Sequence, residues 1–152
     1  MAISDLPRYG RSRRPRDSQR SRLYKAQWEI GAGHNFKTIP ALREYVSAIL
    51  RHDWWRYYFP HVPDVTVKDG RGRKNAGAHT TTDGPTILMP RWSRTERVTL
   101  HELAHLVTPD AAPAHGPKFA RLYVCIVTEY MGHQAGQGLI NAYLKHGVRY
   151  DR

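Results

Sequence analysis

Two histidines and a glutamate stand within five consecutive residues, in the run His101-Glu-Leu-Ala-His105. Histidines four positions apart lie on one face of an α-helix, so both imidazoles can reach a single metal ion. The carboxylate of Glu102 is then placed to accept a proton from a water molecule that the metal activates. These residue types at this spacing predict a zinc hydrolase. The prediction requires a helix here and a third ligand elsewhere, because the chain holds nine histidines and a short pattern can arise by chance.

A third ligand is needed because catalytic zinc normally binds three protein groups and a water molecule. The metzincin pattern places glycine at position 108 and histidine at position 111, where this chain has Thr108 and Ala111, so that class is excluded. The candidates are His115 and Glu129. A helix beginning at Pro117 has an apolar face that includes His115 when it is extended backwards, and Glu129 lies roughly 100° away from that face. We therefore expect His115 as the third ligand, with Glu129 as the alternative.

Start and stop signals predict that residues 94–107 form the helix that the metal site requires. Ser93-Arg-Thr-Glu96 has the form of a capping box, in which the Ser93 hydroxyl and the Glu96 carboxylate bind backbone amides at the helix start. Pro109 is placed to end the helix. A core-facing stripe is expected from Leu100, Leu103 and Val107. The two histidines lie beside that stripe, where they can line a cleft.

The other segments predict a small α+β domain. Helices are expected over residues 17–30, capped by Asp17 or Ser18, over 40–50, from Pro117 to Tyr130 with Gly116 as N-cap, and over 133–147. Strands are expected over 65–67, 78–82 and 86–89, and the turn at residues 83–85 makes the last two a hairpin. The five aromatic residues within 53–59 are expected mainly in the core, with stacking on bases as the alternative. The residues of the last helix that we expect to be buried are Leu139, Ile140, Tyr143 and Leu144.

The metal-binding run His101-Glu-Leu-Ala-His105, followed at short range by His115-Gly-Pro-Lys-Phe119, resembles the SprT-like and WLM-type small zincin metalloproteases. This group includes the Spartan proteases, which degrade proteins crosslinked to DNA. Over most of the chain the sequence is also similar to a group of metallohydrolases of actinobacteria and their phages. That likeness rests on residues 17–24, 94–119 and 142–148.

The resemblance implies a zincin-like α+β fold, with a small and mainly antiparallel sheet packed on the helix of residues 101–105 and further helices before and after it. It implies one Zn²⁺ ion on His101, His105 and His115, with Glu102 as the base. It also implies that part of residues 78–89 is an edge strand that takes the substrate as an added strand. The sequence does not decide which of the two stretches is the edge.

A tyrosine or histidine donor stabilises the transition state in several hydrolases of this kind. Tyr143 and His146, on the last expected helix, are candidates for that role. The alternative assigns Tyr143 to core packing and His146 to the C-terminal end of the helix dipole.

The chain is strongly basic, with 24 lysines and arginines, 13 acidic residues and a formal net charge of +11. Residues 1–22 hold seven arginines and two aspartates, a net +5. We expect residues 1–17 to form a disordered basic arm and residues 18–152 a single domain. Such charge attracts nucleic acid, with a solubilising tail or a codon bias towards arginine as the alternative. The arginines expected to contact nucleic acid are Arg11, Arg13, Arg14, Arg16 and Arg20.

One cysteine, Cys125, precludes an internal disulfide and indicates a reducing compartment. The sequence has no apolar run as long as a membrane span and no signal-peptide apolar region at its N-terminus. We therefore expect a cytoplasmic protein, of a bacterium or a phage-infected host, without a membrane partner.

The function that these patterns predict is a zinc-dependent metallopeptidase, acting on a protein or peptide substrate that is associated with nucleic acid. The alternative is a nucleic-acid-binding or phage structural protein in which a metal only ties two helices together. Structural zinc sites usually include cysteine, whereas this chain has a single cysteine and does carry the glutamate that hydrolysis needs. Both facts favour catalysis.

Overall fold

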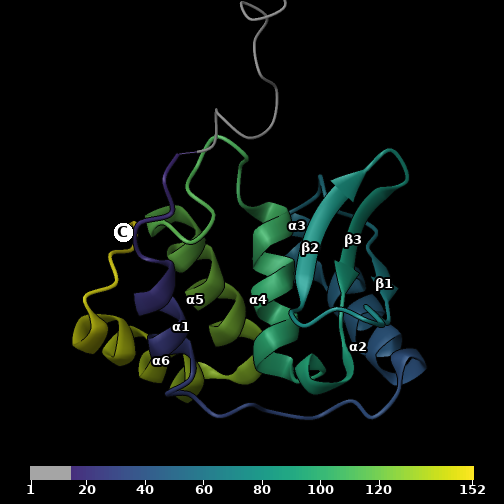
Figure 1. The fold of residues 1–152 in the computed structure, drawn as a ribbon, viewed down its shortest axis with the longest axis horizontal. Helices are drawn as coiled ribbons and strands as arrows, with labels where there is room; N and C mark the ends of the chain where they lie inside the picture. Colours follow the sequence, from purple (N-terminus) through teal and green to yellow (C-terminus); the bar gives the residue numbers. More distant parts are fainter. Residues whose placement is uncertain (1–14) are drawn as a thin grey trace, which may run out of the picture.

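The computed structural model describes residues 15–152. Most of the expected basic arm, with Arg11, Arg13 and Arg14, therefore lies outside the described residues. The described chain contains six α-helices, one 3₁₀ turn and a three-stranded sheet (Figure 1). In chain order these are α1 (Arg20–Gln27), α2 (Ile39–Arg51), α3 (Asp53–Tyr58), β1 (Thr66–Lys68), β2 (Gly77–Thr81), β3 (Gly84–Leu88), the 3₁₀ turn η2 (Arg91–Ser93), α4 (Glu96–Val107), α5 (Pro117–Met131) and α6 (His133–His146). The expected α+β class is confirmed. Among these helices none combines the length and the apolar character needed to cross a membrane.

Helix α4 lies in the middle of the fold, between the sheet and a group of helices (Figure 1). On one side α4 packs on α5, α5 on α6, and α6 on α1. On the other side α4 contacts β2 and β3, and α2 packs on β1 and α3. The core includes fully buried side chains from every helix and from β3, among them Leu23, Leu42, Trp55, Ile87, Leu100, Phe119 and Leu139. The helix that carries His101 and His105 is therefore held by close packing from both sides.

The sheet has the strand order β1-β3-β2, so β3 is central and β2 is an edge strand. β2 and β3 are antiparallel, with Ala78 opposite Ile87 and Thr81 opposite Gly84, which confirms the expected hairpin. β1 pairs with β3 in parallel, with Val67 also opposite Ile87. The sheet is therefore mixed, with five antiparallel and three parallel residue pairs, so the expectation of a mainly antiparallel sheet is only partly correct. The three strands alternate in direction along the chain, so placing β3 in the centre makes β1 its parallel neighbour.

The start of α4 differs from the expected capping box. The helix begins at Glu96 rather than at residue 94, and Thr95 is the N-cap, with its side-chain oxygen accepting from the Val98 amide at 3.2 Å. The Ser93 hydroxyl, expected to cap the helix, instead donates to the Pro90 carbonyl at 2.7 Å. Both hydroxyls bind backbone groups, but Thr95 is the one at the correct position for the first turn.

Glu96 is not part of a capping box, because its carboxylate binds partners from distant segments. Its carboxylate accepts from the His34 amide at 2.8 Å and from the Tyr45 hydroxyl at 3.0 Å. Gly33 makes this approach possible: its φ is +73°, and a Cβ at this position would lie 2.8 Å from the Glu96 carboxylate. The segment before α2 is thereby fastened to the start of α4.

Helix α1 spans Arg20–Gln27 instead of residues 17–30, and no side chain caps it. Asp17 does not cap this helix, because its carboxylate binds His115. Gln19 fixes the start of α1 to the C-terminal segment: its amide nitrogen donates to the Arg149 carbonyl at 2.9 Å, and its oxygen accepts from the Arg149 amide at 3.0 Å. α1 is therefore positioned by long-range contacts, which place it beside α4 and the residues before α5.

Two expectations about burial are only partly correct. On α6, Leu139 and Tyr143 are buried as expected, but Leu144 is exposed, because the next position after Tyr143 lies about 100° around the helix. Ile140 is partly buried. In the aromatic segment 53–59, Trp55 and Phe59 are buried, whereas Tyr57 and Tyr58 are exposed.

Candidate metal centre

Three histidine rings converge on one point beside the C-terminal half of α4. The Nε2 atom of His101 lies 3.1 Å from Nε2 of His105 and 3.3 Å from Nε2 of His115. One ring nitrogen of each histidine lies within 4.8 Å of the others, and this cluster could hold a metal ion. Tetrahedral binding at about 2.0–2.1 Å separates neighbouring nitrogen ligands by roughly 3.3 Å. The two distances to His101 are close to that value, and His115 is where the sequence predicted the third ligand.

The segment between α4 and α5 brings His115 to the other two histidines. The chain leaves α4 at Thr108, whose hydroxyl donates to the Ala104 carbonyl at 2.7 Å. It then turns back, and the Gly116 amide donates to the Pro113 carbonyl at 3.2 Å. A Cβ at Gly116 would lie 2.9 Å from the Pro113 side chain, so a glycine is needed for this close approach. Helix α5 starts immediately afterwards, which fixes His115 at its N-terminal end.

Two polar side chains orient the histidines through the ring nitrogens that face away from the centre. Nδ1 of His101 is hydrogen-bonded to the side-chain oxygen of Gln27, on α1. Nδ1 of His115 lies 2.7 Å from one carboxylate oxygen of Asp17, and the His115 amide donates to the other at 3.0 Å. Because both partners are acceptors, each Nδ1 carries the proton and each Nε2 presents a lone pair to the centre. This is the arrangement that raises the basicity of metal-binding histidines.

Aromatic rings pack against the three histidines. Tyr24 stacks on His101, with ring centroids 5.3 Å apart and an interplanar angle of 22°, and its ring centroid is 5.2 Å from that of His115. Phe119 contacts all three imidazoles, with centroid distances of 4.5–5.1 Å. Burial and the neighbouring histidines hold the pKa of His101 well below its usual value. His101 is therefore neutral, which is the form that binds a metal.

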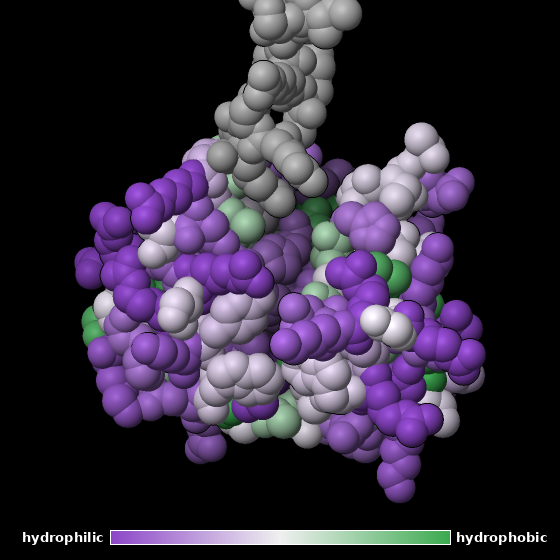
Figure 2. All heavy atoms as spheres, viewed as in Figure 1, coloured by the Kyte–Doolittle hydropathy of each residue, from purple (hydrophilic) through white to green (hydrophobic). Residues whose placement is uncertain are grey.

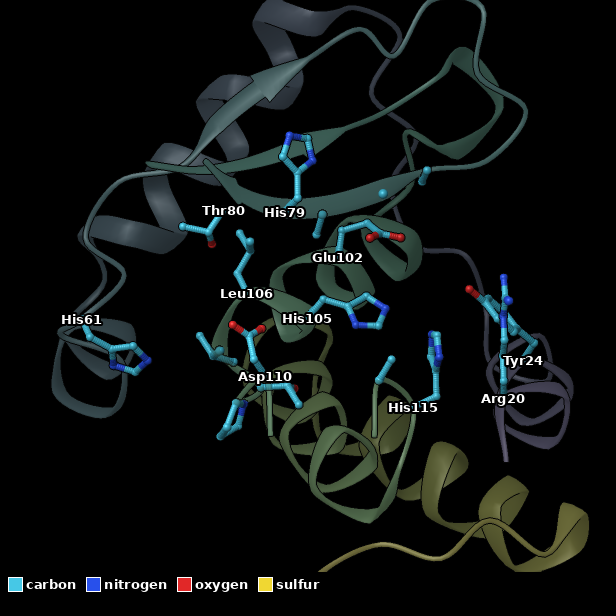
Figure 3. Close-up of a pocket in the computed structure, with 17 residues that line it drawn as sticks. Arg20, Tyr24, His61, His79, Thr80, Glu102, His105, Leu106, Asp110 and His115 are labelled. Carbon is cyan, nitrogen blue, oxygen red and sulfur yellow. The ribbon is translucent and has the colours of Figure 1, made fainter. Parts of the chain in front are cut away.

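Glu102 points into the cavity that His105 and His115 line (Figure 3). Glu102 is only 5% exposed. Burial raises the pKa of this carboxyl to about 8, against a smaller opposing effect of Arg73. A carboxyl group in such a position can exchange a proton near neutral pH.

The cavity in front of the histidines has a volume of about 710 Å³. It is bounded by β2 residues 77–80 on one side, by α4 and the segment after it on a second, and by Arg20 and Tyr24 of α1 on a third (Figure 3). Figure 3 also shows the Tyr24 hydroxyl directed into the cavity. The free edge of the sheet and the candidate metal centre therefore face the same space.

Several residues of this site were not predicted from the sequence. Asp17 was expected to cap a helix, Gln27 and Tyr24 were assigned no role, and Arg20 was expected only to contact nucleic acid. All four come from the segment 17–27, which is far from the histidines in sequence: Asp17 and His115 are 98 residues apart, and Gln27 and His101 are 74 apart. The alternation of polar and apolar residues in this segment gives no sign of such long-range pairing.

Three candidate residues lie away from the centre. Glu129 is an exposed residue of α5 whose carboxylate lies 4.0 Å from Nδ1 of His52, so it is not the third ligand. Tyr143 is buried between helices, with its hydroxyl donating to the Ala120 carbonyl at 2.9 Å. Nε2 of His146 lies 3.2 Å from the carboxylate of Glu29. Neither Tyr143 nor His146 lines the cavity, so the structure does not bring these two expected donors to the site.

Comparisons of the chain with protein-family models, with curated proteins and with solved structures gave no significant match. The functional conclusion therefore depends on the geometry of the site.

Proposed function

We propose that this protein is a zinc-dependent metallopeptidase with a zincin-like fold. The observation that carries the proposal is the convergence of the Nε2 atoms of His101, His105 and His115, of which His101 and His115 are buried, next to the buried side chain of Glu102. Three histidines and an adjacent glutamate are the protein groups that a hydrolytic zinc site requires.

Zinc is the metal that we propose for this donor set. Imidazole nitrogen is a common ligand of zinc, and three protein ligands leave a fourth position for water or substrate, as in catalytic sites. A structural site would be closed by a fourth protein ligand, usually cysteine, and Cys125 is not part of the cluster. Bound at these histidines, zinc lowers the pKa of a water ligand towards neutrality and polarises a carbonyl group.

Glu102 is the proposed general base and acid. In its ionised form it takes a proton from the attacking water molecule, and it then delivers this proton to the nitrogen of the leaving amine. Burial raises the pKa of this carboxyl, so its ionised form accepts a proton more readily than an exposed glutamate does. Tyr24 and Arg20 line the same cavity and can donate hydrogen bonds to the oxygen of the scissile carbonyl as it gains negative charge.

The edge strand β2 supports a peptide as the substrate. β2 pairs with β3 along one side, and its residues 77–80 border the cavity. An extended peptide can add to such an edge through main-chain hydrogen bonds, which do not depend on its sequence. We therefore propose β2 as the substrate-binding edge that was expected within residues 78–89.

Nucleic acid is the proposed partner of the substrate or of the enzyme itself. The net charge of +11 attracts a polyanion, and Arg16 and Arg20 are both exposed close to the site. Of the five arginines expected to contact nucleic acid, Arg11, Arg13 and Arg14 lie outside the described residues. A protein bound to DNA or RNA would be held near the cavity by this charge.

The test is proteolysis by the zinc-loaded protein, assayed on casein and on a basic DNA-binding protein, each with and without DNA. We expect cleavage in the wild type, loss of cleavage on chelation, and recovery when zinc is restored. Glu102→Gln should keep zinc and lose at least a hundredfold in rate. Glu129→Gln, the same change at an exposed position of α5, is the matched control and should cleave normally.

An active Glu102→Gln variant would contradict the proposed mechanism. If no substrate is cleaved under any condition while DNA binding is tight and falls steeply with salt, the alternative of a nucleic-acid-binding or structural protein is correct.

A further inference from the structure

A second cavity opens on the other side of Glu102. It has a volume of about 400 Å³ and shares Arg20, Tyr24, Ala76 and Glu102 with the cavity in front of the histidines. Its lining also includes His101. The two cavities therefore meet at the candidate metal centre. A peptide substrate that extends past this centre from the first cavity enters the second.

Two tryptophans form much of the wall of this second cavity. Trp28 follows the end of α1 and is 47% exposed, and Trp92 lies in η2 before α4 and is 52% exposed. Val98 and the ring of Tyr24 add further apolar surface. In Figure 2, side chains of intermediate hydropathy gather in the middle of a mostly hydrophilic face, between α1 and the start of α4. Exposed aromatic surface that lines a cavity is typical of a binding site.

Neighbouring residues hold both indole rings in place. The guanidinium of Arg97 lies over the Trp28 ring, 4.1 Å from its centroid. Nε1 of Trp92 donates to the Lys74 carbonyl at 2.7 Å, which ties the segment before β2 to the start of α4. A preformed wall of this kind loses little conformational entropy when it binds a side chain.

The direction of β2 indicates which substrate residue reaches this cavity. β2 runs from Gly77 next to the second cavity to Thr81 away from it, and Asn75 and Ala76 before the strand line the second cavity. A peptide added antiparallel to β2 runs from the first cavity towards the second. The residue that follows the scissile bond therefore reaches the second cavity. Antiparallel pairing is the slightly more stable arrangement per residue.

We propose that this second cavity, which we name the tryptophan pocket (Trp28, Trp92, Tyr24 and Val98), binds a large apolar side chain, such as phenylalanine or leucine, of the residue after the scissile bond. The inference rests on the proposed peptidase function and extends it to substrate specificity. The charges agree with an apolar occupant: Arg20 at the mouth and Arg97 behind Trp28 disfavour a basic side chain, and the carboxylate of Glu102 disfavours an acidic one.

The test measures binding, not activity. Three peptide hydroxamates are titrated calorimetrically into the zinc-loaded protein. They differ only in the side chain that mimics the residue after the scissile bond, which is benzyl, methyl or carboxymethyl. We expect the benzyl compound to bind at least tenfold more tightly than the methyl compound, and the carboxymethyl compound to bind no better than the methyl one.

Two variants test whether the second cavity causes the preference for the benzyl compound. Trp92→Ala removes part of the wall, and Ser21→Phe fills the cavity from an exposed position of α1 that lines it. Each should reduce the advantage of the benzyl compound to threefold or less. Tyr57→Ala, a change of an exposed aromatic residue of α3 that lines neither cavity, is the control and should keep the full advantage.

The outcomes separate the two proposals. Equal affinity for the benzyl and methyl compounds, or tightest binding of the carboxymethyl compound, overturns the apolar pocket and leaves the peptidase function standing. An unchanged benzyl preference in both Trp92→Ala and Ser21→Phe also overturns the pocket. If the zinc-loaded protein binds none of the three hydroxamates, the peptidase function fails and the pocket fails with it.

Discussion

Asp17→Asn should weaken zinc binding although Asp17 does not touch the metal. The Asp17 carboxylate accepts two hydrogen bonds from His115, one from Nδ1 at 2.7 Å and one from the backbone amide at 3.0 Å. An asparagine has only one acceptor oxygen, so its NH₂ group would face one of these two N–H donors. Losing such a partner of a metal-binding histidine typically costs 10–100-fold in metal affinity, or about 1.4–2.7 kcal/mol.

The assay is competition for zinc against a chelating indicator at pH 7.5. Asp17→Asn should raise the zinc Kd by about 10–100-fold, and Asp17→Ala by at least as much, because both hydrogen bonds are then lost. Asp64→Asn is the matched control: Asp64 is exposed and is not part of the site, so the zinc Kd should not change. A folded Asp17→Asn protein whose zinc Kd stays within threefold of the wild type would refute the reasoning that Asp17 orients His115.

Three further outcomes are expected. In metal-free protein, burial raises the pKa of Glu102 from 4.5 to about 8, so its contribution to stability is complete below about pH 4.5 and is lost as the pH rises through 8. This loss of stability amounts to at most about 5 kcal/mol. The fall in Tm between pH 5 and pH 8 should therefore be smaller in Glu102→Gln than in the wild type. Parallel curves of Tm against pH for the two proteins would show that Glu102 is not the cause. Tyr24→Phe should keep zinc and lower kcat/KM by roughly 10²-fold, because one donor to the developing oxyanion is lost, and unchanged kinetics would remove Tyr24 from the mechanism. Thr95→Ala should lower the free energy of unfolding in urea by about 1 kcal/mol, whereas Thr95→Ser, which keeps the capping hydroxyl, should cost less; equal losses would argue against Thr95 as the cap.

The parts of the site that were predicted from the sequence have local signals. The spacing of His101 and His105 matches one helical turn, Pro117 starts a helix with Gly116 as its N-cap, and the helical face places His115 inward. The β2–β3 hairpin was likewise predicted from its turn residues. Each of these features depends on residues within a few positions of one another.

The features that were missed or wrong depend on long-range contacts. Glu96 had the correct spacing for a capping box with Ser93, but its carboxylate binds His34 and Tyr45 instead. Asp17 had the correct position for a helix cap, but its carboxylate binds His115. In each case the carboxylate binds a residue that is distant in sequence instead of the nearby backbone amide. The periodicity of the sequence gives no sign of that distant residue. The mixed sheet has the same origin, because strand order is set by the packing of the whole domain.

The central claim is that three histidines hold one zinc ion, and metal content tests it most directly. The measurement is the zinc content of protein purified by gel filtration, for the wild type, His115→Ala and Glu129→Ala. The proposed zinc site predicts about one zinc per chain in the wild type and in Glu129→Ala, and less than about a tenth of that in His115→Ala, because two histidines alone bind zinc weakly. A wild type without zinc, or a fully loaded His115→Ala protein beside an empty Glu129→Ala protein, would contradict the site described here.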